Sequence, residues 1–162
     1  MRHLPLLAAA ALAPLASLAP VAMGLDDQEP AKPQLIPFEE LCDDIGNAGR
    51  EETRALLTSA EDYAAMFAHE PPAEVDFSAE WVVFYSAGLK PTGGHEAGVS
   101  AIELTEAGRG LRITTRLLSP GKACEVMQHP SKPYVLAKLP IPARALQVVR
   151  FAHVDVQLDC TD

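Results

Sequence analysis

In several stretches of the chain, apolar and polar residues alternate with a period of two residues, which is the pattern of a half-buried β-strand. Residues 153–159 read HVDVQLD, and residues 111–116 read LRITTR. The run WVVFYSAG at 81–88 is instead continuously apolar and rich in aromatic and β-branched residues, as suits a buried strand. The pattern predicts seven or eight strands, at residues 38–46, 50–57, 81–88, 99–106, 111–118, 134–140, 145–151 and 153–159.

One segment, residues 58–72, has the period of a helix instead. Thr58 and Glu61 have the T-x-x-E spacing of a capping box, in which each residue satisfies a backbone amide at the helix start. Apolar residues at 63, 66 and 67 form one face, and the prolines at 71 and 72 end the helix.

Short strands, frequent turns and a single helix define the predicted fold class. We expect a mainly β (α+β) protein, with a single β-sandwich or barrel-like domain over residues 38–162 and one packed helix. Residues 25–37 are polar and carry three prolines, which predicts a flexible, extended leader.

The first 24 residues have the pattern of a secretory signal peptide. A short positive start precedes an Ala- and Leu-rich apolar run, and small residues at 22 and 24 suit a cut before Leu25. Prolines at 5, 14 and 20 interrupt the run, and no cluster of cations follows it. We therefore expect a bacterial periplasmic or secreted protein, without membrane insertion after signal cleavage.

The excess of acidic residues argues against negatively charged binding partners. The formal net charge is −9, and removal of the signal peptide takes away Arg2 but no acid. A chain this acidic does not neutralise phosphates, so nucleic-acid binding is disfavoured, as is adhesion to anionic membranes.

Three cysteines, Cys42, Cys124 and Cys160, allow one disulfide and one remaining thiol. An exported protein retains disulfides. Joining Cys42 to Cys160 would close the longest loop, for which chain entropy gives roughly 4–5 kcal/mol of stabilisation. We expect that pair, with Cys124 as a small buried residue or a free thiol.

The stretch KPTGGHE, from Lys90 to Glu96, separates two predicted strands. Pro91 fixes φ, Thr92 can bond to nearby backbone, and Gly93 and Gly94 permit positive φ. One interpretation is a tight turn or bulge. The other is a contact loop, because a Gly-Gly pair lets a second chain approach the backbone, and binding residues concentrate on loops held by a rigid sheet.

The stretch from Asp76 to Pro140 resembles the C-terminal domain of PrcB, a subunit of a protease complex, and its bacterial relatives. The resemblance rests on two blocks of residues. The first block is Gly88, Lys90, Pro91, Thr92, Gly93 and Gly94, and the second is Pro120, Gly121, Pro133 and Tyr134. His95 departs from the pattern, which has Tyr there. The same block is also similar to the N-P-T-T-G-Y loop of chagasin-type inhibitors of cysteine proteases.

The resemblance implies an exported, non-enzymatic binding or accessory protein. Its partner is expected to be another protein, with a protease among the candidates, and no cofactor is implied. The residues expected at the contact are Lys90, Pro91, Thr92, Gly93, Gly94, His95, Pro120 and Gly121.

Two further hypotheses come from different classes of protein. Cys124 and His129, with Met127 between them, are ligand types of blue-copper sites, so a metal-binding or redox β-sandwich is an alternative. However, copper proteins place the Met after the His. A purely structural envelope protein is the other alternative. The sequence has no G-x-S-x-G nucleophile elbow and no EF-hand calcium loop, and a Cys124 dyad with His95 or His129 has no further support.

Overall fold

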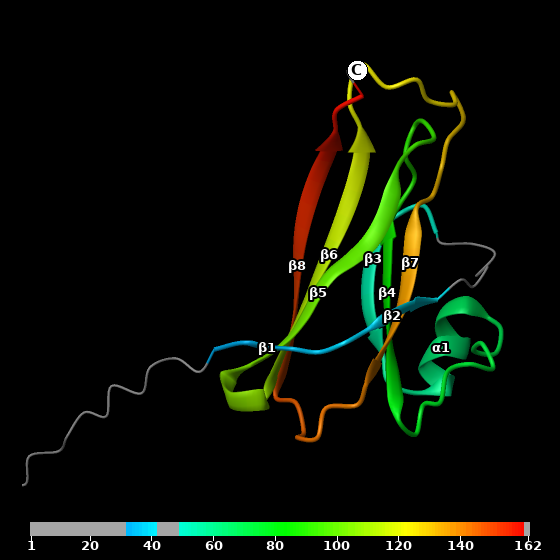
Figure 1. The fold of residues 1–162 in the computed structure, drawn as a ribbon. Helices are drawn as coiled ribbons and strands as arrows, with labels where there is room; N and C mark the ends of the chain where they lie inside the picture. Colours follow the sequence, from blue (N-terminus) through cyan, green and yellow to red (C-terminus); the bar gives the residue numbers. More distant parts are fainter. Residues whose placement is uncertain (1–31, 42–48, 161–162) are drawn as a thin grey trace, which may run out of the picture.

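The computed structural model describes residues 32–41 and 49–160 of the chain (Figure 1). The predicted signal peptide, Cys42 and the larger part of the predicted leader lie outside these residues. Within them the chain forms eight strands, one α-helix and one 3-10 turn. The elements are β1 (Gln34–Leu35), β2 (Glu39–Leu41), β3 (Glu52–Leu57), α1 (Ala60–Phe67), β4 (Glu80–Ala87), β5 (Glu96–Thr105), η1 (Glu106–Gly108), β6 (Gly110–Pro120), β7 (Tyr134–Pro140) and β8 (Val148–Leu158).

The strands form two four-stranded sheets, in the orders β1-β5-β6-β8 and β2-β7-β4-β3. All pairs are antiparallel except β6 and β8, which run parallel from Gly110↔Val148 to Pro120↔Leu158. Apolar side chains of both sheets meet in one buried cluster, as in a β-sandwich. The predicted mainly β class with a single helix is confirmed.

Strand β4 is buried on both faces. Val83 and Tyr85 face the other sheet, while Val82 and Phe84 point to the opposite side, where they meet Tyr63 of α1. Successive side chains of a strand alternate between faces, so a strand covered on both sides needs apolar residues at every position. This is why residues 81–88 lack the alternation seen elsewhere, and it makes the molecule three layers thick at the helix (Figure 1).

The N-cap lies one residue later than predicted, and the helix ends at Phe67, before the prolines that were predicted to stop it. Ser59 is the N-cap, and its hydroxyl accepts from the Asp62 backbone amide at 3.1 Å. The Asp62 carboxylate accepts in return from the backbone amide and the hydroxyl of Thr58, at 3.1 and 2.9 Å. The helix start is therefore held by Asp62 together with Ser59 and Thr58, rather than by a pair of Thr58 and Glu61, and the bonds to its carboxylate lower the pKa of Asp62. No helix in the described residues has the length and apolar character for a membrane crossing.

Two boundaries differ from the prediction. Gln34 and Leu35 pair with β5 and Ile36 is buried, so ordered structure starts inside the stretch predicted as a leader. The predicted strands 145–151 and 153–159 are a single strand, β8. No glycine or proline interrupts it, and the parallel ladder with β6 supports its backbone along its whole length.

Candidate functional site

The predicted contact loop, Lys90–His95, joins β4 to β5 at the end of the sandwich farthest from η1 (Figure 1). Gly88 starts the departure from β4 with φ of +73°, and a Cβ there would lie 2.8 Å from the Arg50 carbonyl oxygen. Lys90 then forms an isolated antiparallel bridge with Ser131, through backbone bonds of 2.8 and 3.1 Å. The segment is thus a loop docked on a second loop rather than a minimal turn.

The centre of the contact loop is fixed by the segment that follows β6. The Ser131 hydroxyl donates to the Thr92 carbonyl oxygen at 2.7 Å. The backbone amide of Gly93 donates to the Met127 carbonyl oxygen at 2.9 Å. Gly93 is buried by this contact, because a Cβ there would lie 3.4 Å from the Cβ of Met127. These bonds hold the loop backbone in one conformation.

Gly94 has φ of +80°, and a Cβ there would approach Val126 Cγ1 at 3.0 Å and Pro120 Cγ at 3.6 Å. The structure therefore places Pro120 beside the contact loop. Gly121, the other residue of the predicted pair, lies against β8, where a Cβ would meet the Leu158 carbonyl oxygen at 2.3 Å. The glycine is needed there for the close approach of two backbones.

His95 occupies the position at which the PrcB-like pattern has Tyr. Its Nδ1 lies 3.1 Å from the Ser119 hydroxyl, and its Nε2 lies 3.4 Å from the Thr92 hydroxyl. Burial lowers the pKa of His95, and the nearby charge of Lys90 lowers it further. The imidazole is therefore neutral at pH 7 and serves as a hydrogen-bonding spacer between the loop and β6.

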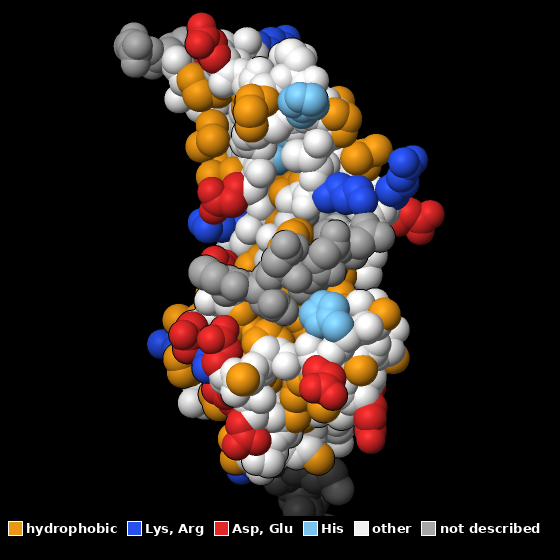
Figure 2. All heavy atoms as spheres, turned by 90° about the vertical axis from the view of Figure 1, so that its right-hand side faces the viewer, with side chains coloured by type: hydrophobic (Ala, Val, Ile, Leu, Met, Phe, Trp, Pro, Cys, Tyr) orange, Lys and Arg blue, Asp and Glu red, His pale blue; other side chains and the backbone are white. Residues whose placement is uncertain are grey.

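The solvent-facing surface of the contact loop combines apolar side chains with exposed backbone. Pro91 and Gly94 are exposed, and the Met127 side chain is 72% exposed. A different surface, on the side of α1, carries exposed acidic residues, with acidic side chains spread over its lower half (Figure 2).

The structure corrects the predicted disulfide. Cys160 is bonded to Cys124, with their Cα atoms 5.0 Å apart, and not to Cys42. The parallel pairing of Pro120 with Leu158 brings the exits of β6 and β8 together, so the two cysteines that follow these strands meet. Loop entropy favoured the longer bridge, but bond formation requires Cα atoms within about 7 Å, which the sheet register decides.

The same bond removes the basis of the metal hypothesis. The Cys124 sulfur is engaged with Cys160 and is not available as a thiolate ligand beside His129. Across residues 32–41 and 49–160, no three His, Cys, Asp or Glu side chains converge as metal ligands would. The Cys124 dyad with His95 or His129 loses its nucleophile for the same reason.

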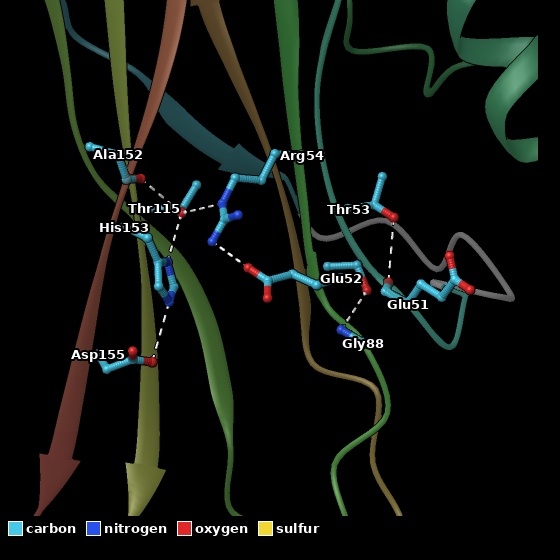
Figure 3. A network of polar contacts seen from close by, with 10 residues as sticks. Glu51, Glu52, Thr53, Arg54, Gly88, Thr115, Ala152, His153 and Asp155 are labelled. Atoms are coloured by element: carbon cyan, nitrogen blue, oxygen red, sulfur yellow. Dashed lines mark hydrogen bonds and ion pairs between the residues drawn. The ribbon is translucent and has the colours of Figure 1, made fainter.

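A polar cluster between the sheets was not predicted (Figure 3). At its centre the buried Thr115 hydroxyl lies 3.2 Å from Arg54 Nε, 2.9 Å from His153 Nδ1 and 3.2 Å from the Ala152 carbonyl oxygen. His153 Nε2 in turn lies 3.3 Å from Asp155. The Thr115 side chain has no exposed surface, so it cannot meet a substrate, and the cluster connects the sheets.

The ring of Tyr85 packs against Arg54 and His153 of this cluster. The Arg54 guanidinium lies 5.1 Å from the centre of the Tyr85 ring, and the His153 ring centre is 5.4 Å away. Burial, and then the negative charge of Glu52, raise the pKa of Tyr85 to about 12. Sequence reasoning noted the alternation of His153 and Asp155 but had no signal for their pairing with residues on β3, β4 and β6.

The fold is that of a two-sheet β-sandwich with a docked loop at one end and one helix on its side. The family model PrcB C-terminal matches residues 81–140, from β4 to β7, and this confirms the predicted resemblance to that domain over this stretch. The matched stretch contains the whole contact loop and the segment that holds it. Searches of curated proteins and of solved structures gave no match.

Proposed function

We propose that this protein is an exported, non-enzymatic accessory protein that binds another protein through the contact loop Lys90–His95 and the adjoining Pro120. The match to the PrcB C-terminal region supports the proposal, because PrcB is associated with a protease complex. A protease or a protease-bound subunit is accordingly the proposed partner. Gly121 belongs to the base of the site rather than to its contact surface, since it packs on β8.

The observation that carries the proposal is the fixed backbone of an exposed loop. Backbone bonds from Lys90 and Gly93 and the Ser131 hydroxyl hold the loop, while Pro91 and Gly94 stay exposed. A loop already ordered in the free protein loses little conformational entropy on binding, so more of the contact energy appears as affinity.

The test is a capture experiment from the native envelope and culture medium, with the mature chain as bait. The loop variant carries Pro91→Glu and Met127→Glu, which change exposed side chains and keep both glycines. The control variant carries Ala65→Glu and Ala73→Glu, two exposed positions away from the loop. Circular dichroism and thermal unfolding establish that both variants fold.

We expect a specific partner with the wild type and the control and its loss with the loop variant. A protease or protease-bound subunit among the captured proteins is the expected identity. Equal capture of the partner by the loop variant would mean that the partner binds another surface of the protein. Absence of any captured protein would leave a structural envelope protein as the better description.

Export to the periplasm or medium is part of the proposal. The predicted signal peptide and the Cys124–Cys160 disulfide support it, since disulfides persist in oxidising compartments. Fractionation of the native bacterium, with N-terminal sequencing of the protein, tests it. We expect a mature N-terminus at Leu25 in the periplasm or medium, and an unprocessed cytoplasmic chain would contradict export.

A further inference from the structure

A cavity of about 500 Å³ opens at the end of the sandwich opposite to the contact loop. It lies between the strand β1, the turn η1 and the segment 140–144 that follows β7 (Figure 1). Its volume is within the range of roughly 300–1,000 Å³ that is usual for small-molecule sites. Nothing in the proposed function uses this end of the molecule.

The walls of the cavity are fixed to the rest of the fold. The Ile36 amide donates to the Ile102 carbonyl oxygen at 2.8 Å, which fastens the β1 side. The Ile141 amide donates to the Ala79 carbonyl oxygen at 2.9 Å on the opposite side. The cavity is therefore present in the free protein.

Most of the lining is apolar. It includes Ile36, Leu104, Ile141 and Pro142, with Leu35 at its open side. The Leu35 side chain is 69% exposed although it belongs to a paired strand. An exposed leucine beside an apolar cavity can bury its side chain against an apolar ligand.

Two cations, Lys32 and Arg144, complete the lining. Arg144 Nη1 donates to the Ala107 carbonyl oxygen at 3.0 Å, and neither cation has a carboxylate partner among the described residues. Glu106, in the adjoining turn, is already paired with Arg150 at 2.7 Å. Two uncompensated cations in a chain of net charge −9 give this cavity a preference for anions.

The turn η1 stores strain in the wall of the cavity. Glu106, Ala107 and Gly108 all have positive φ, of 53°, 55° and 85°, and only the last is a glycine. Ala107 and Gly108 line the cavity, and the Ala107 carbonyl group positions Arg144. Left-handed non-glycine residues cluster at ligand sites, where the surrounding structure holds them in place.

We propose that this cavity binds a small amphipathic carboxylate. Its apolar tail would lie against Leu35, Leu104 and Ile141, and its carboxylate would bind Lys32 and Arg144. The site is independent of the contact loop, at the other end of the sandwich, so each proposal can fail without the other.

Decanoate is the probe, at concentrations below micelle formation, with decanol and decyltrimethylammonium as neutral and cationic analogues. Isothermal titration calorimetry of the mature chain should give saturable binding of decanoate, at least tenfold tighter than that of either analogue. The paired variant Lys32→Gln with Arg144→Gln should lose most of this preference and bind decanol as before. The matched control, Arg50→Gln with Lys122→Gln, should bind decanoate like the wild type.

A second pair of variants tests the apolar part of the cavity. Ala143 is an exposed lining residue, so Ala143→Trp should block binding of all probes without disturbing the core. Ala73→Trp, an exposed change elsewhere, should leave binding intact. NMR shifts of the wild type on adding decanoate should concentrate at β1, η1 and residues 140–144. Absence of saturable decanoate binding, equal affinity for the three probes, or shifts mapped to another surface would overturn the proposal.

Discussion

Arg54 on β3 donates a hydrogen bond of 3.2 Å from Nε to the hydroxyl oxygen of Thr115 on β6, across the gap between the two sheets. The same hydroxyl also forms a hydrogen bond of 2.9 Å with Nδ1 of His153 on β8. Replacing Thr115 with Val keeps the shape of the side chain but takes away the hydroxyl that pairs with the part-buried Arg54 Nε and His153 Nδ1. We expect a loss of roughly 1–3 kcal/mol in the free energy of unfolding, measured by urea denaturation.

Thr114→Val is the matched control for this change. Thr114 is the preceding residue of β6 and points to the other face of the sheet, where it is only half-buried. We expect a change within about 0.5 kcal/mol there. Similar values for the two variants would mean that the hydroxyl of Thr115 does not join the sheets.

The disulfide between Cys124 and Cys160 spans 36 residues. The chain-entropy relation gives roughly 4 kcal/mol of stabilisation for a closed loop of this length, so the variant with Ser at both positions should unfold at a clearly lower urea concentration. Cys42→Ser should leave both the cross-link and the stability unchanged. Peptide mapping under non-reducing conditions decides the pairing, and a peptide that joins Cys42 to Cys160 would contradict the structure.

Gly88 and Gly49 allow a comparison of backbone strain with steric clash. Both have positive φ, +73° and +78°, but a Cβ meets the Arg50 carbonyl oxygen at 2.8 Å only at Gly88. Gly49→Ala should cost about 1–2 kcal/mol through the left-handed backbone alone. Gly88→Ala should cost more, because the start of the contact loop must also move away from Arg50. Equal losses in thermal or urea unfolding would show that the clash relaxes freely.

The neutral His95 predicts a pH dependence. Burial and Lys90 hold the pKa of His95 below its ordinary value of 6.5 in the folded state, so the unfolded chain binds this proton more readily. The contribution of His95 to stability is fully present above pH 6.5 and declines as the pH falls through the window between 6.5 and the folded pKa. NMR titration of the His95 ring should give a midpoint below 6.5. The His95→Gln variant should show a flatter decline in stability across that window, and an unchanged decline would assign it to other groups.

Local patterns predicted most of the elements but not their partners. The apolar run at 81–88 correctly predicted a buried strand, whereas the helix ends at Phe67, before the prolines at 71 and 72 that were predicted to stop it. The cluster of Arg54, Thr115 and His153 depends on the register of three strands far apart in the sequence, which no local pattern encodes. The error on Cys42 has the same origin, because loop entropy depends on chain length and not on the parallel pairing of β6 with β8.

For the contact loop, the sequence predicted which residues belong together but not how they are held. Pro91, Gly93 and Gly94 indicated a loop whose backbone is accessible, and the match over residues 81–140 confirmed the resemblance to the PrcB C-terminal domain there. The role of Ser131 and Met127 as supports was missed, since loop-to-loop hydrogen bonds through backbone atoms have no residue signature. The cavity was missed for a similar reason, because Lys32 and Arg144 are far apart in the chain.

The parallel pairing of β6 with β8 has a consequence for the order of folding. Between these two strands the chain passes through the other sheet as β7, so the pairing of β6 with β8 closes a loop that contains a strand of the second sheet. Strand β6 pairs with β5 through a short turn but with β8 only across β7, so we expect pulsed amide exchange during refolding to protect β8 later than the β5–β6 hairpin. Until then β6 is an unpaired sheet edge, which exposes a nascent chain to strand pairing with its neighbours.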